Sequence, residues 1–296
     1  MSDDGNDLPF TGERFTPECV REIWYEHWHR YAFARPLARG RRVLDAACGE
    51  GYGSALLADV AGSVVAVDID DTTIEHARRR YASHANLEFR RDDVTALGAL
   101  PEASFDLVCC FETLEHVEAQ DALLAGFARL LGPGGLLLVS SPDKAEYSDA
   151  RGFRNEFHLR EIYRDELEAL LGRHFAHRRL FAQKLLFQSA LWSVDGADAR
   201  ADPGDDRSAG ETATLAVTTS RAGAIEPGFG HAPMYYLAAC SQSPLPPLPA
   251  AHLFGDAEES VYRHYDAEVR KNMAAGERIA ELERQLARFQ KGDGGN

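Results

Sequence analysis

The sequence predicts an α/β fold, in which a doubly wound, mostly parallel sheet is wrapped by helices. Continuous apolar runs typical of buried parallel strands alternate with segments of helical periodicity. Polar residues follow the ends of four of these runs, as expected where parallel strands end at one edge of a sheet. At 296 residues the chain is long enough to bury a full core, and its length suits one domain with appendages.

The first expected strand runs into a glycine-rich turn, VLDAACGEGYG, at residues 43–53. Glycines allow a tight turn and the close approach of a ligand to the backbone. A dinucleotide fingerprint that starts at Gly49 needs another glycine at position 54, where this chain has Ser54. Asp45 and Glu50 add negative charges that would repel a pyrophosphate. The turn therefore favours a ligand with positive charge and no phosphate, and the alternative is a plain chain reversal.

The second expected strand, residues 64–68, ends in Asp68. This acid follows Gly49 by nineteen positions, which is near the spacing at which a carboxylate binds the hydroxyl groups of a ribose. The expected ligand therefore contains a ribose.

The third and fourth expected strands bring further polar groups to the same edge. Residues 87–90 lead into Asp92, Asp93 and Val94, and residues 105–111 end beside a glutamate. Because the carboxyl ends of parallel strands meet at one edge, these groups are expected to surround one cleft.

The remaining elements continue the alternation of helix and strand. In chain order we expect helix 71–81, helix 119–131 ended by the breaker 132–135, helix 160–171, a strand near 180–192, a loop near 195–211 and a strand at 235–240. The loop is rich in Gly, Asp and Ala and nearly free of large apolar residues, so we expect it to be mobile.

The chain divides into four parts by composition. These are an N-terminal helical cap at 1–40, a core domain at 41–242, a proline-rich linker at 243–249 and a helical tail at 250–296. In the tail Ile279, Leu282, Leu286 and Phe289 recur at intervals of three, four and three. This spacing predicts either a short coiled coil between two chains, and hence a homodimer, or a helix that packs on its own domain or frays.

Charge and cysteine usage disfavour several classes of protein. The 32 basic and 47 acidic residues give a net charge of −15, which opposes nucleic acid or an anionic membrane as a partner. The five cysteines show no C-x-x-C spacing, and Cys109 and Cys110 lie in an expected buried strand, so a reducing compartment is expected. The N-terminus has no basic region before a long apolar stretch, and no other run reaches membrane-spanning length. We therefore expect a cytoplasmic protein.

The ordered motifs carry a resemblance to a known family. VLDAACGEGYG, VVAVDID, RDDV, FDLVCCFETLEHV and LLGPGGLLLVSSP, between residues 41 and 142, resemble the class I S-adenosylmethionine-dependent methyltransferases. The resemblance implies a Rossmann-like, seven-stranded sheet whose last two strands form an antiparallel hairpin. It also implies S-adenosylmethionine as cofactor, whose sulfonium and ammonium groups suit an acidic cleft.

The resemblance assigns expected roles to the residues at the strand ends. Gly49 and Gly51 bring backbone close to the cofactor, with Asp45 near its amino-acid end, and Asp68 takes the ribose hydroxyls. Asp93 is the residue implied to bind the adenine amino group, with Asp92 as the neighbouring candidate. The residues implied around the purine are Ile69, Val94 and Phe111.

An aromatic and basic stretch precedes the first strand at residues 25–34. In related methyltransferases a segment in this place folds over the cofactor, which would put Arg30 or Tyr31 near the methionine carboxylate. The alternative is an amphipathic helix whose aromatic residues only cover the sheet.

The expected chemistry lies in ETLEHV, residues 112–117. In one interpretation His116 alone is the general base that takes a proton from a hydroxyl. In another, Glu112, Glu115 and His116 bind a divalent cation such as Mg²⁺, because residues three and four apart share a helix face. The E-x-x-E-H pattern resembles metal-dependent small-RNA 2′-O-methyltransferases and ubiquinone-pathway O-methyltransferases, and His158 matches the ligand that follows their fifth strand. A third interpretation makes Glu115 and His116 surface and capping residues.

The acceptor is expected to offer a hydroxyl group. A cation chelated by two adjacent oxygens lowers the pKa of one hydroxyl, and sugars and catechols both offer such a pair. Residues 12–15, 26–27 and 148–158 resemble methyltransferases of bacterial polysaccharide and glycoside biosynthesis. We therefore expect O-methylation of a sugar on a small-molecule or glycan precursor. The alternatives are an O- or N-methyltransferase of aromatic or natural-product compounds and a non-catalytic regulator that binds the cofactor.

Overall fold

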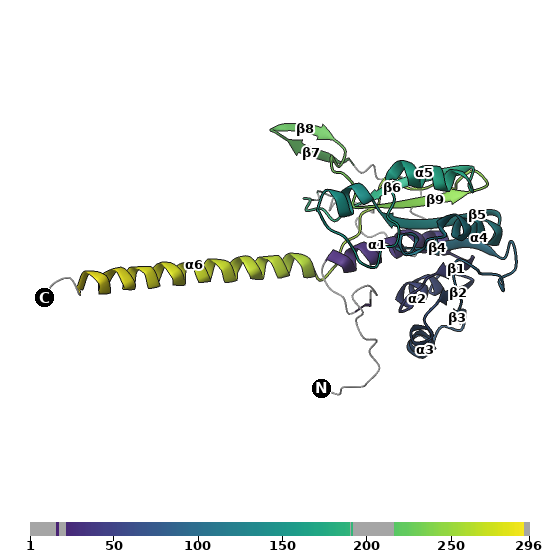
Figure 1. Ribbon diagram of the computed structural model, residues 1–296, viewed down its shortest axis with the longest axis horizontal. Helices are drawn as coiled ribbons and strands as arrows, with labels where there is room; N and C mark the ends of the chain where they lie inside the picture. Colours follow the sequence, from purple (N-terminus) through teal and green to yellow (C-terminus); the bar gives the residue numbers. More distant parts are fainter. Residues whose placement is uncertain (1–15, 18–21, 190, 192–215, 293–296) are drawn as a thin grey trace.

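The computed structural model describes residues 16–17, 22–189, 191 and 216–292. The described part contains a seven-stranded sheet flanked by helices and a separate two-stranded hairpin (Figure 1). The strands of the large sheet are β1 (Arg42–Ala46), β2 (Ser63–Asp68), β3 (Leu87–Arg91), β4 (Phe105–Cys110), β5 (Leu131–Pro142), β6 (His177–Gln183) and β9 (Tyr235–Ser241). The α-helices are α1 (Glu22–Ala38), α2 (Tyr52–Ala58), α3 (Asp71–Arg80), α4 (Gln120–Leu130), α5 (Arg164–Gly172) and α6 (Ser260–Gly292). Two short turns complete the set, the 3-10 turn η1 (Leu114–His116) and the π turn η2 (Ala145–Asp149).

The strand order in the large sheet is β3-β2-β1-β4-β5-β9-β6. Strands β1 to β5 run parallel to one another, whereas β9 lies antiparallel between β5 and β6. This arrangement confirms the expected Rossmann-like sheet with one antiparallel strand. The chain reverses its direction of travel across the sheet between β1 and β4, and such a switch point opens a crevice at the carboxyl ends of the strands.

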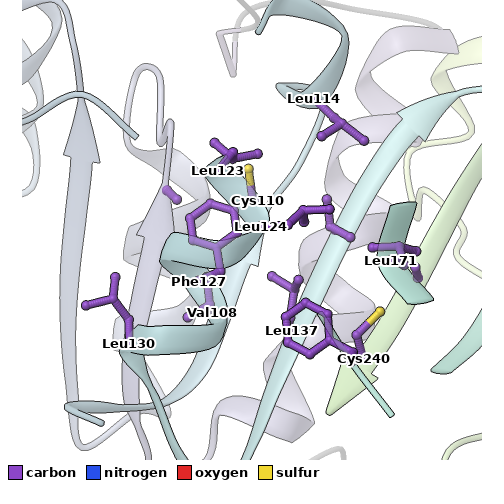
Figure 2. Close-up of a cluster of buried hydrophobic side chains, with 14 of the residues drawn as sticks. Val108, Cys110, Leu114, Leu123, Leu124, Phe127, Leu130, Leu137, Leu171 and Cys240 are labelled. Atoms are coloured by element: carbon purple, nitrogen blue, oxygen red, sulfur yellow. The ribbon is translucent and has the colours of Figure 1, made fainter. Parts of the chain in front are cut away.

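The alternation of side chains along each strand builds a core on both faces of the sheet. Leu44 and Val108 pack toward α4 and α5, while their neighbours Val43 and Leu107 pack toward α1 and α2. Figure 2 shows the first of these layers, where Phe127 of α4 lies among aliphatic side chains of the sheet and the helices. Burying one such side chain stabilises the fold by about 1.5–3 kcal/mol, so the two layers fix the strand ends firmly in space.

The boundaries of the later elements differ from the sequence expectation. The sixth strand was expected near 180–192 but is β6 at His177–Gln183, because the apolar residues that follow it line a surface cavity instead of extending the strand. Helix α5 begins at Arg164, where Glu166 accepts a hydrogen bond from the backbone of Tyr163. The hairpin of β7 (Thr218–Arg221) and β8 (Ala224–Pro227) was not expected, because its residues are mostly polar and exposed.

Several features expected from the sequence lie outside the described residues or beside them. The loop near 195–211, the segment 12–15 and the side chain of Phe289 lie outside the described residues. Residues 243–249 form neither helix nor strand, and Leu245 and Leu248 pack against the layer that contains α1. No described helix combines the length and the apolar character that a bilayer crossing requires.

The C-terminal helix α6 extends away from the domain over most of its length (Figure 1). Its first turns contact the domain, since Val261 is buried and the hydroxyl of Tyr265 donates a hydrogen bond to Glu22. Farther along, Ile279 is exposed. Packing on its own domain therefore accounts for the start of this helix. It does not account for the exposed apolar side chains of Ile279, Leu282 and Leu286, which we call the apolar seam.

Candidate functional site

A cleft with a volume of about 1060 Å³ opens at the carboxyl ends of the central strands. One wall comes from α1, through Glu22, Ile23, Glu26, His27 and Tyr31. The floor comes from the turn after β1 and the end of β2, through Ala47, Cys48, Gly49, Tyr52, Asp68 and Ile69. The far end is built by Phe111 to Thr113, Glu115, His116, Tyr147, Arg151, Asn155, Phe157, His158, Met234 and Tyr235.

Gly49 and Gly51 of the turn differ in what surrounds their Cα atoms. Gly51 has a φ of 95°, and a Cβ added there would lie 2.7 Å from the ring of Phe89, so packing excludes a side chain. Gly49 has a φ of 53° and no atom within 4 Å of an added Cβ, because it faces the open cleft. Its bare backbone is therefore accessible to a ligand.

Asp68 lies at the floor of the cleft beside this turn. Its carboxylate accepts hydrogen bonds from the backbone amides of Gly49, at 2.9 Å, and Asp70, at 3.0 Å. The side chain thus ties the end of β2 to the glycine turn and holds a fixed negative charge in the cleft. Ile69, the next residue, is an exposed apolar side chain that also lines the floor.

Asp45 lies beneath the cleft wall, since its side chain is buried. The hydroxyls of Tyr31 and Ser54 donate hydrogen bonds to its carboxyl group, at 3.1 and 2.6 Å. Burial raises the pKa of Asp45 to about 7, against the lowering effect of these hydrogen bonds. Tyr31 covers Asp45 and itself lines the cleft, so in this state the contact surface is the tyrosine.

Glu50 does not contribute its charge to the cleft, contrary to the sequence interpretation. Its buried carboxylate lies 3.1 Å from both His76 Nε2 and Arg80 Nη1, and it accepts a hydrogen bond from the hydroxyl of Tyr81. These partners belong to α3 and the residue after it. Glu50 therefore fastens the glycine turn to α3, and its charge is compensated there.

Arg30 is buried behind the cleft and supports its wall. Its Nε donates a hydrogen bond to Gln183, its Nη2 lies 3.3 Å from Glu112 Oε1, and its guanidinium stands 4.7 Å from the ring centroid of Tyr235. Glu112 and Tyr235 line the cleft, whereas Arg30 does not. Its placement therefore orients two wall residues.

The candidate adenine residues Asp92, Asp93 and Val94 are not among the residues that line the cleft. Asp92 Oδ1 accepts a hydrogen bond from the backbone amide of Asp93, and Asp93 Oδ1 accepts two from Thr95. These bonds from Thr95 lower the pKa of the Asp93 carboxyl. Val94 packs against the core. Of the three residues implied around the purine, Ile69 and Phe111 line the cleft, and the roles of Asp92, Asp93 and Val94 stay predictions.

At the far end, η1 is joined to the chain segment that follows β5. The backbone oxygen of Glu115 accepts hydrogen bonds from the amides of Leu159 and Arg160, at 2.9 and 3.0 Å. His116 Nδ1 lies 3.0 Å from the backbone oxygen of Phe157. These contacts bring the ring of His158 to 4.9 Å from the ring of His116, in an edge-to-face arrangement.

Three atoms that could bind a metal ion converge at this end of the cleft. They are a carboxylate oxygen of Glu115 and one ring nitrogen each of His116 and His158, and they lie within 4.8 Å of one another. Glu115 is buried and the two histidines are half-buried. His158 also contacts Glu161, with its Nδ1 at 2.5 Å from the carboxylate, and the side-chain amide of Asn155, at 3.0 Å from its Nε2. A carboxylate oxygen and two imidazole nitrogens form a donor set that fits a divalent transition-metal ion.

Glu112 is not part of this group, although the sequence placed it among the ligands. Its carboxylate accepts a hydrogen bond from Ser140 at 2.5 Å and pairs with Arg30. Its φ of 50° is uncommon for a residue with a side chain, and the amide of Glu112 donates to the same Ser140 hydroxyl. Such strained backbone is concentrated at functional strand ends.

Sequence reasoning did not single out several residues that line the cleft, among them Tyr147 and Tyr235. Tyr147 lies in η2 after β5, and its ring stacks on His158 at 5.3 Å between centroids. Tyr235 begins β9 and pairs in register with Pro142 at the end of β5. Only this long-range pairing places Tyr235 at the cleft, and no local signal reveals it.

Comparison with known proteins finds similarity over the central region. Residues 44–139 match the family model described as a methyltransferase domain. A probable S-adenosylmethionine-dependent methyltransferase of Mycolicibacterium smegmatis is 40% identical over 167 residues, which cover 55% of this chain and 63% of that protein. A ubiquinone biosynthesis O-methyltransferase of Xanthomonas oryzae is 38% identical over 112 residues, covering 38% and 47% of the two chains.

These matches are confined to part of each protein. The chain spans about three fifths of the length of the mycobacterial relative. Among solved structures, the YcgJ protein of Bacillus subtilis aligns at 20% identity with a TM-score of 0.48, over 53% of this chain and 73% of that one. The fold assignment rests on the strand order itself.

Proposed function

We propose that this protein, whose central residues form a class I S-adenosylmethionine-dependent methyltransferase domain, methylates a hydroxyl group of an acceptor bound at the far end of the cleft. The observation that carries the proposal is the continuity of the cleft from Gly49 and Asp68 to His116. A single cavity thus joins a nucleoside-binding edge to a group that can accept a proton.

The residues at the floor of the cleft fit S-adenosylmethionine. Gly49 offers bare backbone, and Asp68 offers a carboxylate to ribose hydroxyls. Glu22 in the α1 wall is an acidic group that suits a ligand with positive charge. When bound, the cofactor supplies a methyl group on a sulfonium, which is reactive toward an oxygen nucleophile without further activation.

His116 is the residue best placed to act on the acceptor hydroxyl. Its Nδ1 donates to the backbone oxygen of Phe157, which puts the lone pair of the ring on Nε2. In the proposed reaction Nε2 takes the hydroxyl proton, the oxygen forms a bond to the methyl carbon, and the electron pair of the broken carbon–sulfur bond stays on sulfur. The acidic residues around the far end stabilise the imidazolium that forms.

We propose a sugar hydroxyl as the acceptor. The far end combines the rings of Tyr147, Phe157 and Tyr235 with the polar side chains of Asn155 and Arg151. Aromatic rings can cover the apolar face of a sugar, while amide and guanidinium groups donate to its hydroxyls. An aromatic hydroxyl is the second candidate, because the similar Xanthomonas protein is named as an O-methyltransferase of ubiquinone biosynthesis.

A divalent cation at Glu115, His116 and His158 is the second candidate for activating the hydroxyl. The convergence of three donor atoms supports it. The two imidazole nitrogens favour an ion such as Mn²⁺ over Mg²⁺, which prefers oxygen ligands. Nε2 of His116 cannot bind a cation and take a proton at the same time, so the base and the cation are alternatives for one site.

We also propose a cytoplasmic location. Support comes from the four described cysteines, Cys48, Cys109, Cys110 and Cys240, which are buried free thiols as expected in a reducing compartment.

A labelled-methyl transfer assay tests the proposed function. The full chain is incubated with S-adenosylmethionine that carries an isotopic methyl group and with three acceptor sets, which are nucleotide-linked or glycosidic sugars, catechols, and amines. Label on a sugar oxygen, located by mass spectrometry, is the expected result. Label on a catechol oxygen supports the second candidate. Label on nitrogen overturns the proposal, as does tight cofactor binding without transfer to any acceptor in cell extract, which indicates a regulator.

A further inference from the structure

Helix α6 presents an apolar seam to solvent. The helix has 33 residues, which corresponds to about 50 Å at 1.5 Å per residue, and Figure 1 shows it projecting beyond the domain. Along it Ile279, Leu282 and Leu286 are 57%, 47% and 58% exposed. Most of the stability of a protein helix comes from packing of its apolar face, so this seam calls for a partner surface.

The seam follows a seven-residue repeat. One set of positions, each seven residues after the last, holds Tyr265, Asn272, Ile279 and Leu286. The set three residues later includes Ala275 and Leu282. These are the a and d positions of a two-stranded coiled coil, and a single polar residue at an a position, here Asn272, fixes the register and number of strands.

Charges beside the seam favour one partner and one orientation. Arg278 occupies a g position and Glu283 the following e position, which face each other between the two chains of a parallel coiled coil. In the described part of α6, ion pairs within the helix join Arg284 to Glu281 and Lys271 to Glu268, whereas Arg278 and Glu283 take part in none. Both are therefore available to a second helix.

The opposite orientation is less favourable. In an antiparallel pair, g positions face g positions, so Lys271 and Arg278 would meet like charges of the second copy. We propose that α6 pairs with α6 of a second copy of this chain as a parallel, in-register coiled coil. The close packing runs from Asn272 to Leu286, because Glu268 occupies a d position and weakens the seam before it.

The parallel arrangement sets both domains at the same end of the coiled coil. Helix α6 starts next to the cleft wall, where Tyr265 bonds Glu22 and Phe187 contacts the ring of Tyr265. Dimerisation therefore restrains the beginning of α6 and, through it, the first turn of α1. This role does not depend on which acceptor the cleft binds.

Sedimentation velocity on the full chain over a range of concentrations tests the proposal. The parent is expected to dimerise, and Leu282→Lys/Leu286→Lys is expected to be monomeric with unchanged cofactor affinity. A control with two lysines on the outer face, Ala274→Lys/Ala280→Lys, is expected to dimerise like the parent, since both alanines are exposed and off the seam. A parent that is monomeric at high concentration, or a dimer that survives the seam variant, overturns the proposal.

Charge exchange tests the parallel register separately. Arg278→Glu and Glu283→Arg each place like charges opposite one another at two symmetric contacts, so each single variant is expected to weaken the dimer roughly tenfold. The double variant Arg278→Glu/Glu283→Arg restores opposite charges and is expected to regain the parent affinity. Additive weakening in the double variant would rule out the parallel, in-register pairing. These surface charge reversals leave the apolar seam intact, so they remain informative if the lysine variants fold poorly.

Discussion

His116 Nδ1 lies 3.0 Å from the backbone oxygen of Phe157. A carbonyl oxygen can only accept a hydrogen bond, so Nδ1 is the donor, and in the neutral ring the lone pair lies on Nε2. The segment after β5 thus selects the tautomer of a residue that follows β4. The neighbouring bonds from Leu159 and Arg160 to Glu115 hold the two segments together, so the ring is oriented before any acceptor binds.

Replacement of His116 by alanine is expected to lower kcat by about 10² to 10⁴, the usual contribution of a general base, with cofactor affinity nearly unchanged. Isothermal titration with S-adenosylmethionine and single-turnover transfer rates measure the two effects. His177→Ala, at an exposed position at the start of β6, serves as the control and should match the parent. An active His116→Ala enzyme would leave the far end of the cleft without its proposed chemistry.

Asp68→Ala is expected to weaken S-adenosylmethionine binding by roughly 1.5–3 kcal/mol, the usual effect of losing charge-assisted hydrogen bonds. The same change also releases the amides of Gly49 and Asp70, so Asp68→Asn, which keeps one acceptor oxygen, should bind with intermediate affinity. Calorimetric titration gives both values. Glu75→Ala, at an exposed position of α3 with no role assigned to it, is the matched control. Unchanged affinity in Asp68→Ala, together with NAD binding by the parent, would contradict the cofactor assignment.

The fold could be predicted from the sequence because its central strands, β1, β2, β4 and β5, are mostly buried and therefore read as apolar runs. The local pattern also placed Asp68 and Gly49 at one edge. It could not show which strand-end groups other elements cover. Tyr31 arrives from α1 and covers Asp45, and α3 compensates the charge of Glu50, and both contacts join segments far apart in the chain.

The far end of the cleft was predictable only in part. The E-x-x-E-H pattern was interpreted as one helix face, but the structure has a single 3-10 turn at Leu114–His116 that begins after Glu112. The three- and four-residue spacing of an α-helix therefore does not apply. Glu112 turns instead toward Arg30, whose position depends on the packing of α1. The approach of His158 to His116 followed from the family resemblance, since no local rule relates the two.

Glu26 makes stability depend on pH in a defined direction. Burial raises its pKa to about 7 from an ordinary 4.5, against the lowering effects of Arg30 and of the hydrogen bond from Tyr235. Between these values the folded protein keeps a proton that the unfolded chain has released. The stabilisation from this group is complete below pH 4.5 and is lost as the pH rises through about 7.

Glu26→Gln is therefore expected to reduce the fall in Tm between pH 5 and pH 8, measured by thermal unfolding at several pH values. Some slope should remain, because Asp45 has its pKa raised to about 7 as well and titrates in the same window. Glu277→Gln, on the exposed part of α6, should keep the slope of the parent. If Tm falls equally with pH in Glu26→Gln and in the parent, the Glu26 carboxyl does not retain its proton on folding.

The cation alternative predicts that Glu115, His116 and His158 act together. If they hold Mn²⁺, Glu115→Gln and His158→Ala should each lose the metal, measured by elemental analysis after dialysis, and most of the activity. Cofactor affinity should stay close to that of the parent, because the cation serves the acceptor hydroxyl and not the adenosine. Glu112→Gln is the control for metal content, since its carboxylate pairs with Arg30 and lies outside the ligand group.

The base alternative gives a different pattern for the same variants. If His116 acts alone, only His116→Ala is severely impaired, Glu115→Gln and His158→Ala are mild, and EDTA leaves the rate unchanged. The Nδ1 contact to Phe157 orients the ring in both cases, so tautomer and position do not separate the two mechanisms. The rate after exhaustive chelation does, because a proton acceptor needs no metal. Full activity under those conditions would remove the cation and leave His116 as the base, whereas recovery of a lost rate by added Mn²⁺ would assign His116 as a ligand.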